Sequence, residues 1–256
     1  MIITNKEQLV YEVKRLSVIA GKVILGYYDN DITVEQKKDK SPVTLADIAA
    51  EKVILDGLKK LTPDIPMIAE ESVASGKIPS IGNQPFWLID PLDGTREFIS
   101  RNGEFTVNIA LIEEGRPTLG VVHIPAKELS FYTSGLSKAH CRSAEKDEII
   151  EVRTPGIDGY VVVASRSHRD PRTDEWLKSI NVKSFTAAGS SLKFCLVAMG
   201  AADLYPRLGR TMEWDTAAGH AVLASAGGSV RTLDGKDLHY GKPGFENPYF
   251  IARGKY

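Results

Sequence analysis

Two aspartates that follow a short apolar run, Asp90 and Asp93, are the residues of this chain best placed to do chemistry. The run at 87–89 is predicted to be a buried strand. A proline between the aspartates and a glycine after them bend the backbone, so the two carboxylates can converge on one point. Thr95 adds a hydroxyl. Carboxylates placed where a strand leaves the core are typical of a hard-cation site, so the segment 90–95 predicts one.

Further acidic residues occur at predicted strand or helix ends, namely Glu70, Asp215 and, nearby in the pattern, Asp47. The histidines are scattered and no H-E-x-x-H motif occurs, so oxygen ligands favour Mg²⁺, Mn²⁺ or Ca²⁺ over zinc. Structural roles remain open for each acid taken alone. Asp215 is a good helix N-cap, Asp93 before glycine is a good turn residue, and Asp47 fits a capping pair with Thr44.

A second candidate site is the segment 187–193, which reads Ala-Ala-Gly-Ser-Ser-Leu-Lys. A glycine and two serines at a predicted helix start offer free backbone N–H groups, and Lys193 projects from the first turn, an arrangement that can hold a phosphate. The alternative is an ordinary serine cap with an exposed lysine. No Walker loop, G-x-G-x-x-G or G-x-S-x-G motif occurs, so P-loop, dinucleotide-fold and serine-hydrolase interpretations lose their usual support.

Composition narrows the function classes further. The 256 residues are 43% hydrophobic and 25% charged, with a formal net charge of -1, which indicates a globular protein without the basic footprint of a nucleic-acid binder. Two cysteines, Cys141 and Cys195, fit a reducing compartment better than a disulfide framework. No signal pattern or membrane-spanning run is found, so we expect a cytoplasmic protein, with peripheral attachment to a membrane surface left open.

The first half of the chain is predicted to lay two helices, 5–28 and one from about 44 to 61, on a mostly antiparallel sheet. Its expected strands are 66–69, 87–89, 105–112, 118–124, 129–132 and 149–152, with a loop at 72–85. After Pro155-Gly156, strands and helices alternate, which is typical of an α/β layer. The expected helices there start at 171, 190 and 215, and the strands are 160–164, 182–186, 202–205, 230–232 and 249–252. We therefore expect two subdomains, residues 1–157 and 158–256.

Three motifs together resemble the signatures of the inositol monophosphatase superfamily. They are Glu70-Glu71-Ser72, the segment Asp90-Pro91-Leu92-Asp93-Gly94-Thr95, and Trp214-Asp215-Thr216-Ala217-Ala218-Gly219. Their order and spacing match over essentially the whole chain. The resemblance implies a layered α-β-α-β-α sandwich, of mixed α+β and α/β character, and a lithium-sensitive, Mg²⁺-dependent phosphomonoesterase.

Within the superfamily, several stretches are similar to the branch of bacterial 3'(2'),5'-bisphosphate nucleotidases. They are residues 96–110, Ser165-Arg166-Ser167-His168, residues 189–195 and Leu204-Tyr205-Pro206-Arg207. That branch removes the 3'-phosphate of adenosine 3',5'-bisphosphate, giving AMP and phosphate, and supports sulfate assimilation; the sulfated relative of this nucleotide is a further candidate substrate. A phosphatase of inositol or sugar phosphates and a nucleotide sensor without catalysis are the alternatives.

The resemblance also implies a role for each matching residue. Glu70, Asp90, Asp93, Asp215 and the carbonyl of Leu92 would bind two or three Mg²⁺ ions. Asp47 and Thr95, with Glu70, would act on the attacking water, and Gly94 and Thr95 would contact the phosphate. The substrate-binding set adds His168, Ser190, Lys193 and Arg207, which would hold the nucleotide and its second phosphate. The expected partner is this small nucleotide rather than a nucleic-acid polymer, and the expected assembly is a monomer or homodimer in the cytoplasm or on the cytoplasmic face of the inner membrane.

Overall fold

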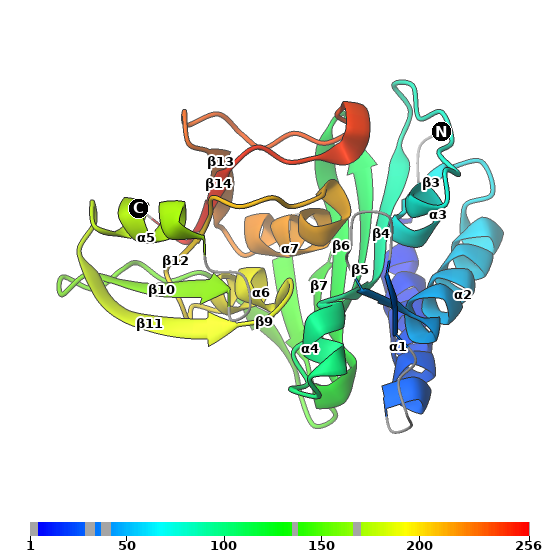
Figure 1. Ribbon diagram of the computed structural model, residues 1–256, viewed down its shortest axis with the longest axis horizontal. Coiled ribbons are helices and arrows are strands. Elements are labelled where there is room, and N and C mark those ends of the chain that lie inside the picture. The colour runs from blue at the N-terminus through cyan, green and yellow to red at the C-terminus, as the bar shows by residue number, and fades with distance from the viewer. Residues whose placement is uncertain (1–4, 29–33, 37–41, 135–137, 166–169, 256) are drawn as a thin grey trace.

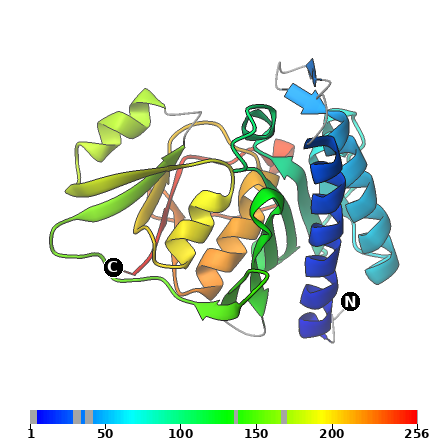
Figure 2. The ribbon, with the colours of Figure 1, turned by 90° about the horizontal axis from the view of Figure 1, so that it is seen from below.

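Two long helices, α1 (Lys6–Tyr28) and α2 (Leu45–Leu61), pack side by side at one end of the molecule (Figures 1 and 2). The computed structural model describes the whole chain except residues 1–4, 29–33, 37–41, 135–137, 166–169 and 256. Leu9, Val13 and Leu16 of α1 are buried at three- and four-residue spacing, because that spacing places apolar side chains on one helix face. Both helices were predicted from this periodicity, and the structure confirms them.

The two helices cover a seven-stranded sheet with the strand order β3-β4-β5-β6-β7-β8-β9. Only the pair β3 and β4 runs parallel, and the other neighbours are antiparallel. The strands are β3 (Met67–Ala69), β4 (Phe86–Asp93), β5 (Thr106–Glu113), β6 (Arg116–Ile124), β7 (Leu129–Ser134), β8 (Lys138–Arg142) and β9 (Asp147–Ile150). This is the mostly antiparallel sheet expected for the first half of the chain.

A second sheet has five strands in the order β11-β10-β12-β14-β13. Strand β10 runs parallel to β11 and β12, whereas β14 is antiparallel to both of its neighbours. The strands are β10 (Tyr160–Ser165), β11 (Val182–Ala188), β12 (Leu204–Arg207), β13 (Ser229–Thr232) and β14 (Phe250–Arg253). A separate antiparallel pair is formed by β1 (Val34–Gln36) and β2 (Pro42–Thr44).

Three further helices complete an arrangement of five layers (Figures 1 and 2). Helices α6 (Leu192–Ala198) and α7 (Glu213–Ser225) lie between the two sheets, and α5 (Pro171–Leu177) packs on the outer side of the second sheet. Short elements are α3 (Glu70–Ala74), α4 (Thr95–Ile99) and the 3₁₀ turns Pro125–Lys127 and Pro243–Phe245. The order is therefore helices, sheet, helices, sheet, helix, which confirms the expected α-β-α-β-α sandwich.

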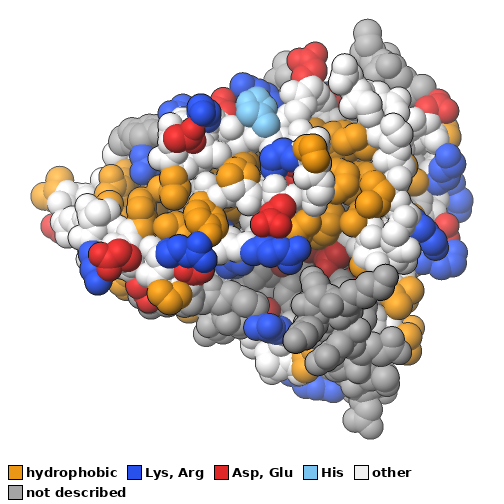
Figure 3. All heavy atoms as spheres, turned by 45° about the horizontal axis from the view of Figure 1, so that its top comes forward, with side chains coloured by type: hydrophobic (Ala, Val, Ile, Leu, Met, Phe, Trp, Pro, Cys, Tyr) orange, Lys and Arg blue, Asp and Glu red, His pale blue; other side chains and the backbone are white. Residues whose placement is uncertain are grey.

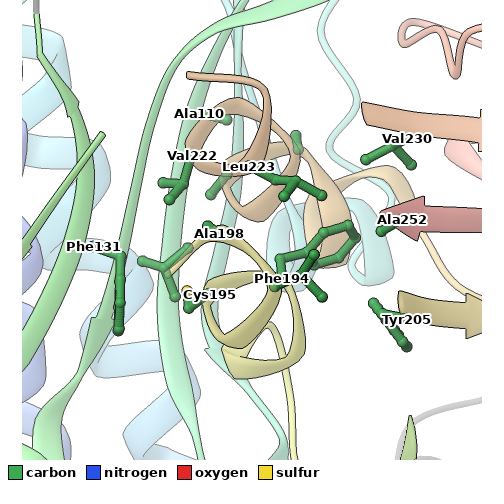
Figure 4. Close-up of a cluster of buried hydrophobic side chains, with 14 of the residues drawn as sticks. Ala110, Phe131, Phe194, Cys195, Ala198, Tyr205, Val222, Leu223, Val230 and Ala252 are labelled. Atoms are coloured by element: carbon green, nitrogen blue, oxygen red, sulfur yellow. The ribbon is translucent and has the colours of Figure 1, made fainter. Parts of the chain in front are cut away.

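The main core lies where α6 and α7 fill the space between the sheets (Figure 4). Phe194, Cys195 and Val222 contribute from the helices, and Phe131 faces them from the first sheet. Helix α7 can approach the first sheet closely because Gly120 has no side chain: a Cβ there would lie 2.5 Å from the carbonyl oxygen of Ala218. Close packing of this kind fixes the start of α7 relative to the strands.

Several expected boundaries differ from the structure. The segment expected to begin a loop forms the short helix α3, and β4 continues through Asp93 rather than ending near Asp90. Helix α6 begins at Leu192, α7 begins at Glu213, and α5 ends at Leu177 rather than near 180. The sequence interpretation also missed β8, because this five-residue strand has polar residues at both ends and an alternating burial pattern too short to stand out.

The surface view in Figure 3 shows Lys and Arg side chains and Asp and Glu side chains interspersed on one face, between areas of apolar side chains. Among the helices that the structure describes, none combines the length and apolar character needed to cross a bilayer. Buried apolar residues concentrate instead between the helices and the two sheets.

Candidate active site

An irregularity in strand β4 places Asp90 and Asp93 on the same face of the sheet. Asp90 pairs with Asn108 and Asp93 with Thr106, so three steps along β4 match two steps along β5. Side chains alternate between faces along a strand, and one extra residue resets that alternation. The predicted convergence of the two carboxylates is thus produced by a bulge inside a paired strand rather than by a turn after it.

The parallel register of β3 and β4 brings Glu70 next to this pair. Ala69 pairs with Ile89, and each is followed directly by an acid, Glu70 at the first position of α3 and Asp90 in β4. Asp90 is buried, and its Oδ1 accepts a hydrogen bond of 3.0 Å from the backbone N–H of Leu92. Acids that follow neighbouring parallel strands meet at one edge of the sheet, so Glu70 and Asp90 face the same space.

Asp215 reaches the same space from α7. It occupies the third position of the helix, and its Oδ2 accepts a hydrogen bond of 2.8 Å from the backbone N–H of Met212. The side chain therefore satisfies a free N–H at the helix start, although Asp215 is not the N-cap residue itself. Burial, and then the negative charges of Asp93 and Glu70, raise the pKa of Asp215 well above its ordinary value.

This mutual repulsion is the observation that tests whether the site fits a cation. Carboxylates that face one another without a counter-charge disfavour each other's ionised form, and a divalent cation removes that penalty. The donors are all oxygens, as Mg²⁺ prefers. Within the described residues no three acidic, His or Cys side chains already form a coordination cluster; the carboxylates instead line a shared, open pocket. Such a donor set suits Mg²⁺, which keeps water or substrate oxygens in its shell.

Asp47 joins this site through Thr95. The Thr95 Oγ1 lies 3.3 Å from Oδ1 of Asp47 and 3.4 Å from the carbonyl oxygen of Leu92. The other carboxylate oxygen, Oδ2, accepts hydrogen bonds from the backbone N–H and hydroxyl of Thr44, at 2.8 and 2.6 Å. The predicted capping pair is confirmed, and one carboxylate serves both the cap and the contact with Thr95. The two interpretations of Asp47 are therefore compatible.

In the segment 189–191, two backbone N–H groups are hydrogen-bonded to carboxylates of the protein rather than free for a ligand. The backbone N–H of Ser191 donates to Oδ2 of Asp93 at 2.7 Å, and that of Gly189 donates to Oε2 of Glu104 at 2.9 Å. The hydroxyl of Ser190 donates to the same Asp93 oxygen at 2.9 Å. The expected helix-start cradle thus has two of its N–H groups already bonded to the protein's own carboxylates.

Lys193 is buried, so the alternative of an exposed lysine beside a serine cap is wrong. Its Nζ donates to the carbonyl oxygen of Ser190 and lies 5.2 Å from the centre of the Tyr205 ring. Burial lowers the pKa of Lys193 to about 8, while the negative charge of Asp93 acts in the opposite direction. Arg207 lies on the same side, where its Nε is buried and has no hydrogen-bond partner among the described residues, and a terminal nitrogen donates to the carbonyl oxygen of Arg210 at 2.7 Å.

One pocket of about 1010 Å³ collects these groups. The predicted site residues that line it are Glu70, Asp90, Leu92, Asp93, Gly94, Thr95, Ser190, Lys193, Arg207 and Asp215. Asp47 stands behind Thr95. His168 lies outside the described residues. The pocket therefore has an acidic side, from the ends of β3, β4 and the start of α7, and a basic side formed by Lys193, Arg207 and Arg210.

Two polar residues near this pocket, Glu51 and Asn108, were not singled out from the sequence, and Ser191 was singled out only as one of the two serines of the predicted helix start. Glu51 is buried, its Oε2 accepts the backbone N–H of Glu71 at 2.8 Å, and its pKa is raised chiefly by burial. Asn108 and Ser191 both contact Asp93. A signal for Asn108 was available, because Thr106 and Asn108 are polar at two alternate positions of the otherwise apolar first part of β5 and mark one face there as different. No local signal marked Glu51.

Comparison with known proteins agrees with this geometry. The model of the inositol monophosphatase family matches residues 5–252, nearly the whole chain. The chain belongs to the inositol monophosphatase family. Among solved structures of the family, a CysQ from Bacteroides thetaiotaomicron is similar, with a TM-score of 0.81, 35% identity and 98% of each chain covered. An IMPase from Thermotoga maritima has a TM-score of 0.79 at 27% identity, covering 96% of this chain and 91% of its own.

Curated members of the family are more similar in sequence. The 3'(2'),5'-bisphosphate nucleotidase CysQ of Escherichia coli K12 is 48% identical over 245 residues, covering 93% of this chain and 97% of its own. The protein of the same name from Salmonella typhimurium is also 48% identical, over 244 residues with the same coverage. The fold and the family membership expected from the three motifs are therefore confirmed.

Proposed function

We propose that this chain is a 3'(2'),5'-bisphosphate nucleotidase that converts adenosine 3',5'-bisphosphate to AMP and inorganic phosphate. The observation that carries the proposal is that one pocket brings the acids Glu70, Asp90, Asp93 and Asp215 together with the buried Lys193 and with Arg207, whose Nε is buried without a partner in the part of the chain that the structure describes. The likeness to curated nucleotidases over 93% of the chain supports it. The sulfated relative of the substrate, which carries the same 3'-phosphate, is a second substrate within this proposal.

The division of charge in the pocket favours a substrate with two phosphates. One phosphate needs a cation held by the acidic side, and the other needs direct positive charge, which Lys193 and Arg207 supply. An inositol monophosphate has no second phosphate to satisfy these groups. Burial disfavours the charged form of Lys193 more than the negative charge of Asp93 favours it, so occupation of the basic side by the second phosphate adds affinity.

On the acidic side, the carboxylates of Glu70, Asp90, Asp93 and Asp215, with the carbonyl of Leu92, would hold Mg²⁺, at two or three ions per site. When bound, Mg²⁺ supplies Lewis-acid chemistry that neutralises phosphate charge and lowers the pKa of water. The residues themselves contribute a rigid set of oxygens, since Asp93 and Asp215 are both fixed by hydrogen bonds from backbone N–H groups.

Asp47 and Thr95 act on the attacking water, together with Glu70. The Thr95 hydroxyl orients the water oxygen, and its contact with Asp47 gives the water's proton a path to a carboxylate. The water oxygen bonds to phosphorus while the bond between phosphorus and the ribose O3' breaks, and O3' takes up a proton. Gly94 and Thr95 contact the transferred phosphate, and Ser190 and His168 complete the contacts with the nucleotide.

The cellular role that follows is removal of a nucleotide by-product during sulfate assimilation. We place this activity in the cytoplasm, with attachment to the inner membrane surface and a homodimer as the alternatives to a free monomer. Hydrolysis of a small nucleotide in one pocket requires no second macromolecule.

The decisive experiment compares phosphate release from adenosine 3',5'-bisphosphate and from inositol 1-phosphate, each with Mg²⁺ and with EDTA. We expect Mg²⁺-dependent release with a clear preference for the nucleotide. A preference for the inositol ester would instead identify a general inositol phosphatase. Tight nucleotide binding without phosphate release in the presence of Mg²⁺ would identify a sensor.

A further inference from the structure

Ser191 occupies the N-cap position of α6 but does not cap its own helix. An N-cap serine ordinarily accepts a hydrogen bond from an N–H in the first turn that follows it. Here the Ser191 Oγ contacts three groups outside α6: the backbone carbonyl oxygen of Asp215 at 2.6 Å, Asp93 Oδ2 at 3.0 Å and Asn108 Nδ2 at 2.9 Å. The side chain is buried, so water cannot replace these contacts at low cost.

The backbone before Ser191 is bent to make these contacts possible. Ser190 has a φ of +52°, in the left-handed region that non-glycine residues rarely adopt. Gly189 packs so closely that a Cβ there would lie 2.7 Å from Cγ of Glu97. Backbone conformations of this kind persist where the surrounding structure determines them, and they concentrate at functional sites. This turn places the backbone nitrogen of Ser191 2.7 Å and its Oγ 3.0 Å from the same oxygen, Oδ2 of Asp93.

The direction of each hydrogen bond follows from counting protons. Asn108 is oriented by Thr106, whose hydroxyl donates to Oδ1 of Asn108 at 3.0 Å, so its Nδ2 faces Ser191 Oγ and Asp93 Oδ2. Asn108 donates to Ser191 Oγ, and the single proton of that hydroxyl then goes to an acceptor. The shorter of the two is the carbonyl oxygen of Asp215, while Asp93 still receives the Ser191 N–H.

This chain of bonds connects two carboxylate residues that lie on different elements. Asp93 ends β4 in the first sheet, and Asp215 lies in the first turn of α7 between the sheets. Ser191 contacts both, Asp93 at its carboxylate and Asp215 at its backbone carbonyl, and Asn108 contacts Asp93 and Ser191. We propose that Asn108 and Ser191 form one positioning unit that sets the distance and orientation between Asp93 and Asp215 for cation binding. The inference rests on the proposed function only in taking these two aspartates as cation ligands.

The physical reason is that a cation site needs its ligands held in place before the cation arrives. Groups that hydrogen-bond to metal ligands orient them, and their loss typically lowers metal affinity by about 10- to 100-fold. Asp93 and Asp215 line the same pocket and repel each other when both are ionised. In the proposed role, Ser191 ties the backbone of Asp215 to the carboxylate of Asp93, so loss of this tie lets the two residues move apart. The unit made by Asn108 and Ser191 opposes that movement. It keeps the two carboxylates close together, so that a bound cation can neutralise both.

The test measures Mg²⁺ binding directly, by isothermal titration calorimetry without substrate. The variants are Ser191→Ala, Asn108→Ala and the double variant, and Asn108→Leu, which is closer in volume, replaces Asn108→Ala if that variant does not fold. We expect each single variant to raise the Kd for Mg²⁺ about 10-fold or more. Because the two residues act as one unit, the double variant is expected to bind about as weakly as the weaker single variant.

Two further variants separate positioning from general stability. Ser130→Ala removes another buried serine hydroxyl, one that contacts the His123 ring and lies outside the pocket, and it should leave Mg²⁺ affinity unchanged. Ser191→Thr retains the hydroxyl and should recover most of the affinity lost in Ser191→Ala. In phosphate-release assays, the Mg²⁺ concentration for half-maximal rate should rise in Ser191→Ala, whereas the KM for the nucleotide at saturating Mg²⁺ should change little.

The outcomes distinguish this inference from the proposed function. Wild-type Mg²⁺ affinity in both single variants would overturn the positioning role while the nucleotidase activity stands. Losses that multiply in the double variant would overturn the claim that the two residues act as a unit. A wild-type protein that binds Mg²⁺ but prefers inositol 1-phosphate would overturn the proposed substrate and leave the positioning role intact. A wild-type protein that binds no Mg²⁺ would overturn both.

Discussion

The Thr95 hydroxyl lies 3.3 Å from Oδ1 of Asp47, a residue 48 positions earlier in the chain, and this contact joins the start of α4 to the start of α2. The opposite oxygen of Asp47 is held by the backbone and hydroxyl of Thr44, so the carboxylate cannot rotate freely. A carboxylate fixed in this way can accept a proton passed through a neighbouring hydroxyl.

Replacement of Thr95 tests this proton path. Thr95→Val keeps the side-chain shape and removes the hydroxyl, and we expect kcat to fall by about 100-fold or more, the usual contribution of a positioned proton acceptor. Thr95→Ser keeps the hydroxyl and should retain most of the activity. Steady-state phosphate release measures both. Equal activity of the valine and serine variants would contradict the path.

Asp93→Asn should abolish turnover. The substitution removes a negative charge from the proposed cation site, and stabilisation by a bound cation is worth several kcal/mol in reactions of this class, so a loss of at least about 100-fold is expected. Asp56→Asn is a matched control, since Asp56 is exposed on α2 and pairs only with Lys52 among the contacts described. Near-normal phosphate release by Asp93→Asn would exclude Asp93 as an essential ligand.

Lys193→Ala should weaken substrate binding more than it slows the reaction. Lys193 is buried on the basic side of the pocket, where it would contact a phosphate that does not react, so its loss raises KM with a smaller change in kcat. Lys52→Ala, at an exposed lysine of α2, serves as the control. The role in anion binding is refuted if KM for adenosine 3',5'-bisphosphate stays at the wild-type value.

Because His123 is buried, we predict that the free energy of unfolding decreases at mildly acidic pH. Burial between α1 and the first sheet lowers the pKa of His123 from 6.5 to about 4, so the unfolded chain takes up a proton between these values that the folded chain does not. The free energy of unfolding therefore falls as pH decreases from about 6.5 towards 4, by up to about 3 kcal/mol from this residue.

Denaturant unfolding at a series of pH values checks this prediction. His123→Gln cannot take up a proton, so its stability should change less steeply between pH 7 and pH 5 than that of the wild type. His239→Gln, at an exposed histidine, should keep the wild-type slope. Identical slopes in all three proteins would show that His123 does not remain neutral in the folded state.

Much of the fold followed from local pattern. The spacing of apolar residues in α1, the Thr44 and Asp47 capping pair, and the Asp170-Pro171 start of α5 are all features of neighbouring residues, and the structure confirms each of them. Local pattern failed where elements were short and polar. Strand β8 and helix α3 have five residues each, too few for a period to be recognised.

The active-site acids could be identified from the sequence because they belong to compact motifs, in which Asp90, Asp93 and Thr95 lie within six positions. How these acids come together could not. The bulge that turns Asp90 and Asp93 to one face depends on the register with β5, and the burial of Lys193 depends on the packing of α6 between the sheets. Register and layer packing are set by distant parts of the chain.

The sequence by itself determined which oxygen and nitrogen groups this protein carries and the order in which its elements follow one another. The tertiary structure decided which of these groups meet. Ser191 lies 98 positions from Asp93 and 24 from Asp215, and it contacts both only because α6 and α7 pack together beside the end of β4. A hydrogen bond between residues far apart in the chain produces no periodic pattern in the sequence, since it depends on how whole layers of the fold pack against each other.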